Sequence, residues 1–164
     1  MKEIKLTQGK VALVDDEDYE KVNCFKWNAI KDRNTFYAKR NIKVSNGLQR
    51  QTTIQMQRLI FGYCGILKID HRDGNGLNNQ KSNLRFATTS QNGMNRKPNK
   101  CALSKFKGVS FHKRHLKFIS SIRINGNSYH LGYFTNEIEA AKAYDKKALE
   151  LFGEFAYLNF PLSK

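Results

Sequence analysis

Acidic residues are scarce in this chain, and they are missing altogether from one long stretch. The 164 residues include 29 Lys and Arg against 14 Asp and Glu, so the formal net charge is +15. Not one acidic residue lies between Gly74 and Asn136. Such a stretch predicts a polyanionic partner, with nucleic-acid phosphate as the first candidate and with binding that weakens as salt rises. A basic membrane-surface segment is the alternative, but it requires an amphipathic helix, and this region has the pattern of strands and turns.

Cysteines and long apolar runs are also few. Cys24, Cys64 and Cys101 are odd in number and widely spaced, and no Cys-x-x-Cys pair occurs. This pattern argues against a disulfide framework and against a zinc knuckle, so we expect reduced thiols. There is no signal-peptide pattern and no apolar run long enough for a membrane span, which predicts a soluble protein with no membrane partner.

The middle of the chain predicts a compact strand, loop, strand, helix unit. Residues 66–70 and 84–87 have the pattern of short strands. The loop between them is rich in Gly and Asn, which favour tight turns because Gly tolerates positive φ and Asn side chains bond their own backbone. Thr88 or Thr89 can then cap a helix that carries Asn92.

This unit carries the residues that a metal-dependent phosphodiester cleavage needs. His71 is suited to activate water, because an imidazole with a pKa of about 6.5 accepts a proton at neutral pH. The carboxylate of Asp70 and the amide oxygen of Asn92 are ligands that suit Mg²⁺. Adjacent strand residues point to opposite faces, so Asp70 and His71 serve one site only if the strand ends there.

The stretch from residue 69 to 96 resembles the HNH nucleases, in the variant whose last histidine is replaced by asparagine. The matching residues are Asp70-His71, Asn83-Leu84-Arg85 and Asn92. The resemblance implies that His71 is the general base, that Asp70 and Asn92 hold one Mg²⁺ or Mn²⁺ ion, and that Asn83 braces the loop and orients the histidine. The alternative is that His71 is an ordinary turn histidine and that the asparagines only cap loops.

Residues 97–103 predict a basic linker, because Lys97, Pro98 and Lys100 occur there with little apolar content. Before it we expect an N-terminal α+β segment, residues 1–60, that packs on a nuclease motif at 61–96. In that segment Asp15 to Asp18 predict the acidic first turn of a helix, with a second metal site as the alternative.

The region after the linker predicts a sheet backed by one helix. Apolar and polar residues alternate from Leu116 to Ile124, and Asn125-Gly126 predicts a hairpin turn. Across that turn we expect three pairs: Arg123 with Ser128, Ile122 with Tyr129, and Ser121 with His130. A helix then follows, with Asn136 as N-cap, Gly153 as its end, and an apolar stripe formed by Ile138, Ala141, Ala148 and Leu151.

Residues 104–161 resemble the plant ethylene-response-factor (APETALA-type) DNA-binding domain. The resemblance rests on Lys107-Gly108-Val109, His130-Leu131-Gly132, Phe134, Glu139-Ala140-Ala141, Ala143-Tyr144-Asp145 and Asn159-Phe160-Pro161. It implies that the sheet enters the major groove of DNA. Ser110 and His112 stand where the plant domains commonly have arginine, and His130 where they have tryptophan, so the plant target sequence does not transfer. The alternative is that these are ordinary solvated strand faces.

Taken together, these patterns predict an α+β protein: a ββα-metal HNH motif with an N-terminal β-rich segment, followed by a three-stranded antiparallel sheet on one helix. We expect a homing-type endonuclease that acts on double-stranded DNA, as a monomer or homodimer, with no small-molecule substrate. We expect it in the cytoplasm or nucleoid of a bacterial host, encoded by a phage.

The expected DNA contacts are Arg85, Arg96, Lys97, Lys107, Ser110, His112, Lys113, Arg114, Lys117, Arg123 and His130. A non-catalytic DNA-binding regulator with a decayed nuclease fold is the second hypothesis, and an RNA-binding or RNA-cleaving protein is the third.

Overall fold

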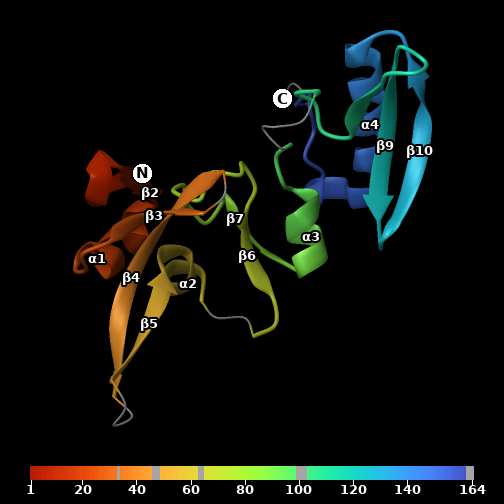
Figure 1. The fold of residues 1–164 in the computed structure, drawn as a ribbon. Helices are drawn as coiled ribbons and strands as arrows, with labels where there is room; N and C mark the ends of the chain where they lie inside the picture. The colour runs from red at the N-terminus through yellow and green to blue at the C-terminus, as the bar shows by residue number, and fades with distance from the viewer. Residues whose placement is uncertain (33, 46–48, 63–64, 99–102, 162–164) are drawn as a thin grey trace. The chain divides into compact units, whose positions relative to one another are not determined.

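The structure is a computed structural model that describes residues 1–164 except 33, 46–48, 63–64, 99–102 and 162–164. The chain divides into two compact units, an N-terminal unit (Met1–Asn92) and a C-terminal unit (Gly93–Lys164). Each unit is described by itself below. Figure 1 labels the main helices and strands of both.

The N-terminal unit is built from short strands and two short helices. Its elements are β1 (Lys2–Lys5), η1 (Thr7–Gly9), β2 (Val11–Val14), α1 (Asp16–Asn23), β3 (Asn28–Asp32), β4 (Thr35–Ser45), β5 (Gln49–Gln55), α2 (Met56–Phe61), β6 (Lys68–His71) and β7 (Leu84–Ala87). The order β3-β4-β5 forms one antiparallel sheet, while β1 with β2 and β6 with β7 form antiparallel pairs. Their apolar faces share one core that includes Val14, Val22, Trp27, Met56 and Leu84.

The loop between β6 and β7 is docked on the N-terminal segment. Leu13 donates its backbone N–H to Leu77 O at 2.8 Å, and Asn79 donates its own to Leu13 O at 2.8 Å. Lys81 Nζ lies 2.6 Å from Glu17 Oε1 and 3.1 Å from Asp18 Oδ2. The acidic run at the start of α1 therefore holds the loop by ion pairs, in addition to suiting the helix dipole.

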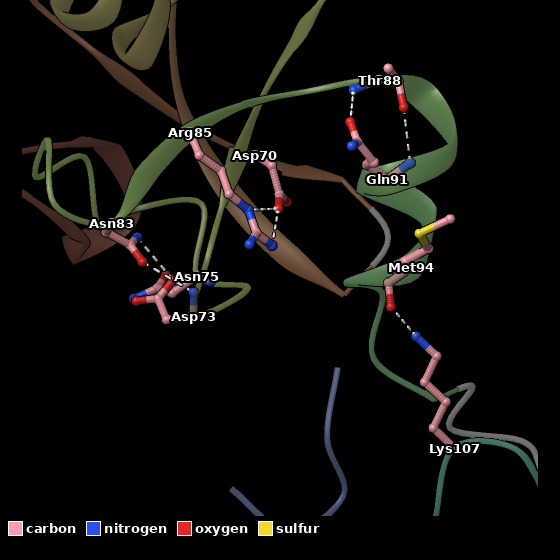
Figure 2. Close-up of polar contacts among 9 residues, drawn as sticks. All are labelled: Asp70, Asp73, Asn75, Asn83, Arg85, Thr88, Gln91, Met94 and Lys107. Atoms are coloured by element: carbon pink, nitrogen blue, oxygen red, sulfur yellow. Dashed lines mark hydrogen bonds and ion pairs between the residues drawn. The ribbon is translucent and has the colours of Figure 1, made fainter. Parts of the chain in front are cut away.

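Helix α3 (Thr89–Met94) follows β7 and begins with a reciprocal cap. Thr88 Oγ1 accepts from the Gln91 N–H at 3.2 Å, and the Thr88 N–H donates to Gln91 Oε1 at 2.9 Å, as Figure 2 shows. This is the capping-box arrangement, which satisfies two donors at a helix start. The six-residue helix crosses the division between the units, with Asn92 on one side and Met94 on the other.

The C-terminal unit has a three-stranded sheet backed by one long helix. Its elements after α3 are β8 (Val109–His112), β9 (Lys117–Ile124), β10 (Asn127–Phe134), α4 (Glu137–Phe152) and η2 (Gly153–Phe155). The strand order is β10-β9-β8, and α4 lies against the sheet in Figure 1. The predicted hairpin register is confirmed for all three pairs across Asn125-Gly126. Both turn residues have positive φ, 50° and 85°, as a two-residue hairpin turn requires.

Helix α4 begins as predicted, and its predicted apolar stripe is confirmed except at Ile138. The Asn136 side chain accepts from the Ile138 N–H at 2.8 Å, and Gly153 ends the helix. Ala141 and Ala148 of the predicted stripe are buried, and Leu151 packs against the same core, but Ile138 is 46% exposed. The helix also buries Ala140, Tyr144 and Phe152.

Several residues that carry the plant-domain resemblance form one internal network. Asn159 accepts from the Lys107 N–H at 2.7 Å and donates to Lys107 O at 3.1 Å, while Asp145 Oδ1 accepts from both Asn159 nitrogens at 2.9 Å. Gly108 has φ +77°, and a Cβ there would meet the Tyr144 ring at 1.9 Å. These residues therefore fix the end of the chain and the start of β8 onto α4.

The predicted linker and the predicted reduced thiols can be compared with the structure only in part. Residues 99–102 of the predicted linker and Cys64 and Cys101 lie outside the described residues, and Cys24 is an exposed free thiol. Within the part of the chain that the structure describes, no helix combines the length and apolar character needed to cross a membrane.

Candidate active site

The pairing of β6 with β7 places the predicted motif residues at one end of a two-stranded ladder. Asp70 is opposite Arg85, and His71 is opposite Leu84. β6 ends at His71, and the next residue, Arg72, donates its N–H to Asn83 O at 2.9 Å. The strand thus stops at the Asp-His pair, which is the condition for the two side chains to serve one site.

His71 is buried, with 4% of its surface exposed, and it has defined neighbours. Its Nε2 lies 3.2 Å from Asn79 Oδ1, and its ring meets Tyr37 edge-on at 5.7 Å between centroids. Burial lowers the pKa of His71 below its usual value of 6.5, while the Asn79 hydrogen bond and the carboxylates of Asp73 and Asp70 act in the opposite direction. The imidazole is therefore neutral at pH 7, the form that can accept a proton.

Asn79 fixes which nitrogen of His71 carries the hydrogen. The Asn79 amide nitrogen donates to Leu77 O at 3.3 Å and lies 3.6 Å from Met56 Sδ, so its oxygen faces the imidazole. That oxygen can only accept, so Nε2 of His71 carries the hydrogen and Nδ1 is the proton-accepting nitrogen. Asn79 is fully buried, which holds this orientation.

Asp70 forms a buried ion pair with Arg85. Nε and Nη2 of the guanidinium donate to the same carboxylate oxygen, Oδ2, at 2.9 and 2.8 Å, as Figure 2 shows. Both residues are about 95% buried, at 5% and 6% exposure. A carboxylate is the donor type that a hard cation prefers, and here Arg85 occupies Oδ2 with two charge-assisted hydrogen bonds.

Asn83 holds the loop in a closed conformation. Its Oδ1 accepts from the Asp73 N–H at 3.0 Å, and its amide nitrogen donates to Asp73 Oδ1 at 3.0 Å and to Asn78 O at 2.8 Å. Asp73 also accepts from the Asn75 N–H at 2.7 Å (Figure 2). Asn79 thus hydrogen-bonds directly to His71, while Asn83 holds the loop through Asp73 and Asn78.

Asn92 is half-buried in α3, where its N–H donates to Thr88 O at 3.0 Å. Among the described residues, no group of three or more His, Cys, Asp and Glu side chains could hold a metal ion. The predicted ligand set, one carboxylate and one amide oxygen, is small, as is usual for Mg²⁺, which keeps several waters. The Asp70 carboxylate fits such an ion in donor type.

The predicted DNA contacts fall into two groups. Arg85 is buried against Asp70, and Lys107 is half-buried with its Nζ donating to the carbonyl oxygen of Met94 at the end of α3. Burial lowers the pKa of Lys107 to about 8. His112 is half-buried, and the remaining side chains are exposed: Arg96, Lys97, Ser110, Lys113, Arg114, Lys117, Arg123 and His130.

Sequence reasoning missed two residues of the site. Asn79 belongs to the Asn-rich loop between the two predicted strands. Nothing in the sequence Asn78-Asn79 indicates that one of the two side chains turns inward and hydrogen-bonds to His71. Tyr37 comes from a strand more than thirty residues away, and no local pattern links it to the motif. Only Thr88 or Thr89 was predicted as the helix cap, and the Thr88-x-x-Gln91 pattern of a capping box was not used.

The comparisons with known proteins agree with the motif. The chain is 33% identical over 144 residues to an uncharacterized HNH endonuclease of Acanthamoeba polyphaga mimivirus, and the alignment covers 84% of this chain and 73% of that protein. The chain belongs to the HNH endonuclease family. No family model matches it. The similarity of residues 104–161 to the plant ethylene-response-factor domain stays a prediction.

Proposed function

We propose that this protein is a metal-dependent DNA endonuclease of the homing type, which hydrolyses phosphodiester bonds of duplex DNA through His71, Asp70 and Asn92. The observation that carries the proposal is the environment of His71, which is buried and hydrogen-bonded through Nε2 to Asn79. A neutral imidazole held in one tautomer at the end of a strand is arranged to act as a general base.

In this proposal Nδ1 of His71 removes a proton from water as the water oxygen attacks phosphorus, and the bond to the leaving oxygen breaks. Mg²⁺ or Mn²⁺, held by Asp70 and Asn92, would neutralise the negative charge that develops on the phosphate oxygens and on the leaving oxygen. Asn83 keeps the loop closed, and the exposed cations of the C-terminal unit bind phosphate and read sequence, as the plant-domain resemblance implies.

The test is relaxation of a supercoiled plasmid with Mg²⁺ or Mn²⁺ and with EDTA. His71→Ala and Asp70→Asn should each lower the nicking rate by at least about 100-fold, in line with losses of a general base or a metal ligand. Asp32→Asn, which changes an exposed carboxylate at the end of β3, is the matched control and should nick at the parent rate. Unchanged nicking by His71→Ala would show that His71 is not the base.

The pH profile gives a second readout of the same assignment. Because burial lowers the pKa of His71, the base stays neutral to more acidic pH, so the acid limb of the nicking rate should lie below pH 6.5. An acid limb above pH 6.5 would contradict the assignment.

The Asp70–Arg85 ion pair favours a second candidate, a DNA-binding regulator that retains a decayed nuclease fold. One carboxylate oxygen already accepts two hydrogen bonds from Arg85, which competes with a cation for that oxygen. This candidate requires salt-sensitive duplex binding with no metal-dependent cleavage, so the plasmid assay distinguishes the two. Competition with RNA tests the third hypothesis, an RNA-directed protein.

A further inference from the structure

Three of the four histidines of this chain gather on one exposed face of the C-terminal sheet. His112 and His115 are stacked, with ring centroids 4.6 Å apart and an interplanar angle of 28°. Tyr133 contacts all three imidazoles, at centroid distances of 6.0 Å to His112, 5.6 Å to His115 and 4.8 Å to His130. We refer to these four residues as the histidine–tyrosine cluster.

The cluster lies on the face of the sheet opposite α4. Along β9, Ser120 and Ile122 are buried, and Ile122 packs with Tyr144 of α4. The alternate β9 residues are the ones paired with the cluster: Lys117 with His112, Ile119 with Tyr133, and Ser121 with His130. Side chains alternate between faces along a strand, so the cluster points away from the helix. Tyr133 is 50% exposed, and His115 and His130 are exposed as well.

The charged groups around the cluster are all cationic. Lys113 and Arg114 lie in the β8–β9 turn, and Lys117 and Arg123 lie on β9, all four exposed. No carboxylate occurs in the sequence of these strands and turns, because the chain has none between Gly74 and Asn136. The first acidic side chains after that, Glu137 and Glu139, belong to α4, the layer behind the sheet. A phosphate backbone is the partner that this charge pattern fits.

The three histidines do not have the same freedom to take up a proton. Nδ1 of His112 accepts from the His115 backbone N–H at 3.3 Å, so a proton on that nitrogen would break the turn's hydrogen bond. His115 and His130 are the exposed members, and both rings contact the Tyr133 ring. An exposed imidazole changes charge between pH 5 and 8, and a nearby phosphate favours its charged form.

We propose that the histidine–tyrosine cluster is a proton-linked DNA contact, in which His115 and His130 become charged against duplex phosphates and Tyr133 holds them in place. This rests on the proposed function only in that the C-terminal unit binds duplex DNA. The affinity for DNA then rises as pH falls, because binding takes up protons. The catalytic residues of the N-terminal unit have no part in it.

The experiment measures binding of the full chain to a labelled DNA duplex, in EDTA and at constant ionic strength, from pH 8.0 to 5.5. The parent should bind about tenfold more tightly at pH 5.5, and His115→Gln/His130→Gln should lose most of that gain. The same double variant should reduce the slope of log K against log salt by about 2 at pH 5.5, because two phosphate contacts are lost. At pH 8.0 its affinity should be close to that of the parent.

Lys113→Gln is the matched control, since it removes a cation that does not titrate in this range. It should weaken binding by a similar factor at every pH. Tyr133→Ala should reduce the pH response, and Tyr133→Phe, which keeps the ring, should retain it.

An equal pH response in the parent and in the double histidine variant would overturn the proposal, as would tighter proton-linked binding to duplex RNA than to DNA. EDTA removes the divalent metal, so the binding assay does not depend on cleavage. A chain that shows this pH-dependent binding but never nicks DNA in the plasmid assay would refute the proposed nuclease activity and leave the present proposal intact.

Discussion

At the scale of single residues, the candidate site combines His71, the proposed base, with a buried ion pair one position away. His71 is neutral because it is buried, and its tautomer is set by Asn79. Asp70 is held by two hydrogen bonds from Arg85. Two neighbours on one strand thus have different partners, an amide for His71 and a guanidinium for Asp70.

The Asp70–Arg85 pair leads to a prediction about stability. Arg85→Met should lower the free energy of unfolding of the N-terminal unit by about 3–5 kcal/mol, because the buried carboxylate loses its partner. Urea denaturation followed by the fluorescence of Trp27, the single tryptophan and part of that unit's core, measures it.

The double variant Asp70→Leu/Arg85→Met removes both charges and is the control. It should recover most of the lost stability, since an apolar pair replaces a buried ion pair at little cost. If the single and double variants were equally unstable, the loss would come from packing and the charge argument would be wrong.

At the scale of elements, the loop between β6 and β7 is the part that assembles the site. It is held by Leu13 of β2, by the α1 carboxylates through Lys81, and by Gly76 against β4. Gly76 donates its N–H to Thr35 Oγ1 at 3.0 Å, and a Cβ at this position would lie 2.5 Å from both Phe36 O and the Tyr37 ring. The position of the loop and that of the Tyr37 ring, which contacts His71, therefore depend on one another.

Gly76→Ala should accordingly disturb the site without touching any reacting group. We expect about 1–3 kcal/mol of lost stability and a slower nicking rate, because the loop must move away from β4. Gly93→Ala in α3 makes the same substitution where nothing lies within 4 Å, and it should leave stability unchanged or raise it by up to about 1 kcal/mol. Equal effects of the two substitutions in urea denaturation would rule out the steric explanation.

At the scale of the whole molecule, the net charge of +15 should dominate association with nucleic acid. If about six phosphates are contacted, the affinity for duplex DNA should fall roughly 1,000-fold between 50 and 200 mM salt. Fluorescence anisotropy of a labelled duplex at pH 7.5 measures it. A nearly salt-independent affinity would contradict the assignment of the exposed cations to phosphate.

Much of the fold was readable from sequence because it is set by near neighbours. The Asn125-Gly126 hairpin, its register and the Asn136 cap follow from turn and capping chemistry that acts over a few residues. The apolar stripe of α4 was predicted in part: Ala141 and Ala148 are buried as expected, while Ile138 is exposed, because the exact face that a helix buries depends on where the sheet lies.

The sequence by itself determined the chemistry of this protein: the Asp70-His71 pair, the motif asparagines and the acid-free basic stretch are properties of residue type and spacing. Only the tertiary structure decided which groups meet. It brought Arg85 to Asp70, Asn79 and Tyr37 to His71, and three histidines to Tyr133. The physical reason is that pairing across loops and between strands is fixed by the burial of the whole core, which no local pattern encodes.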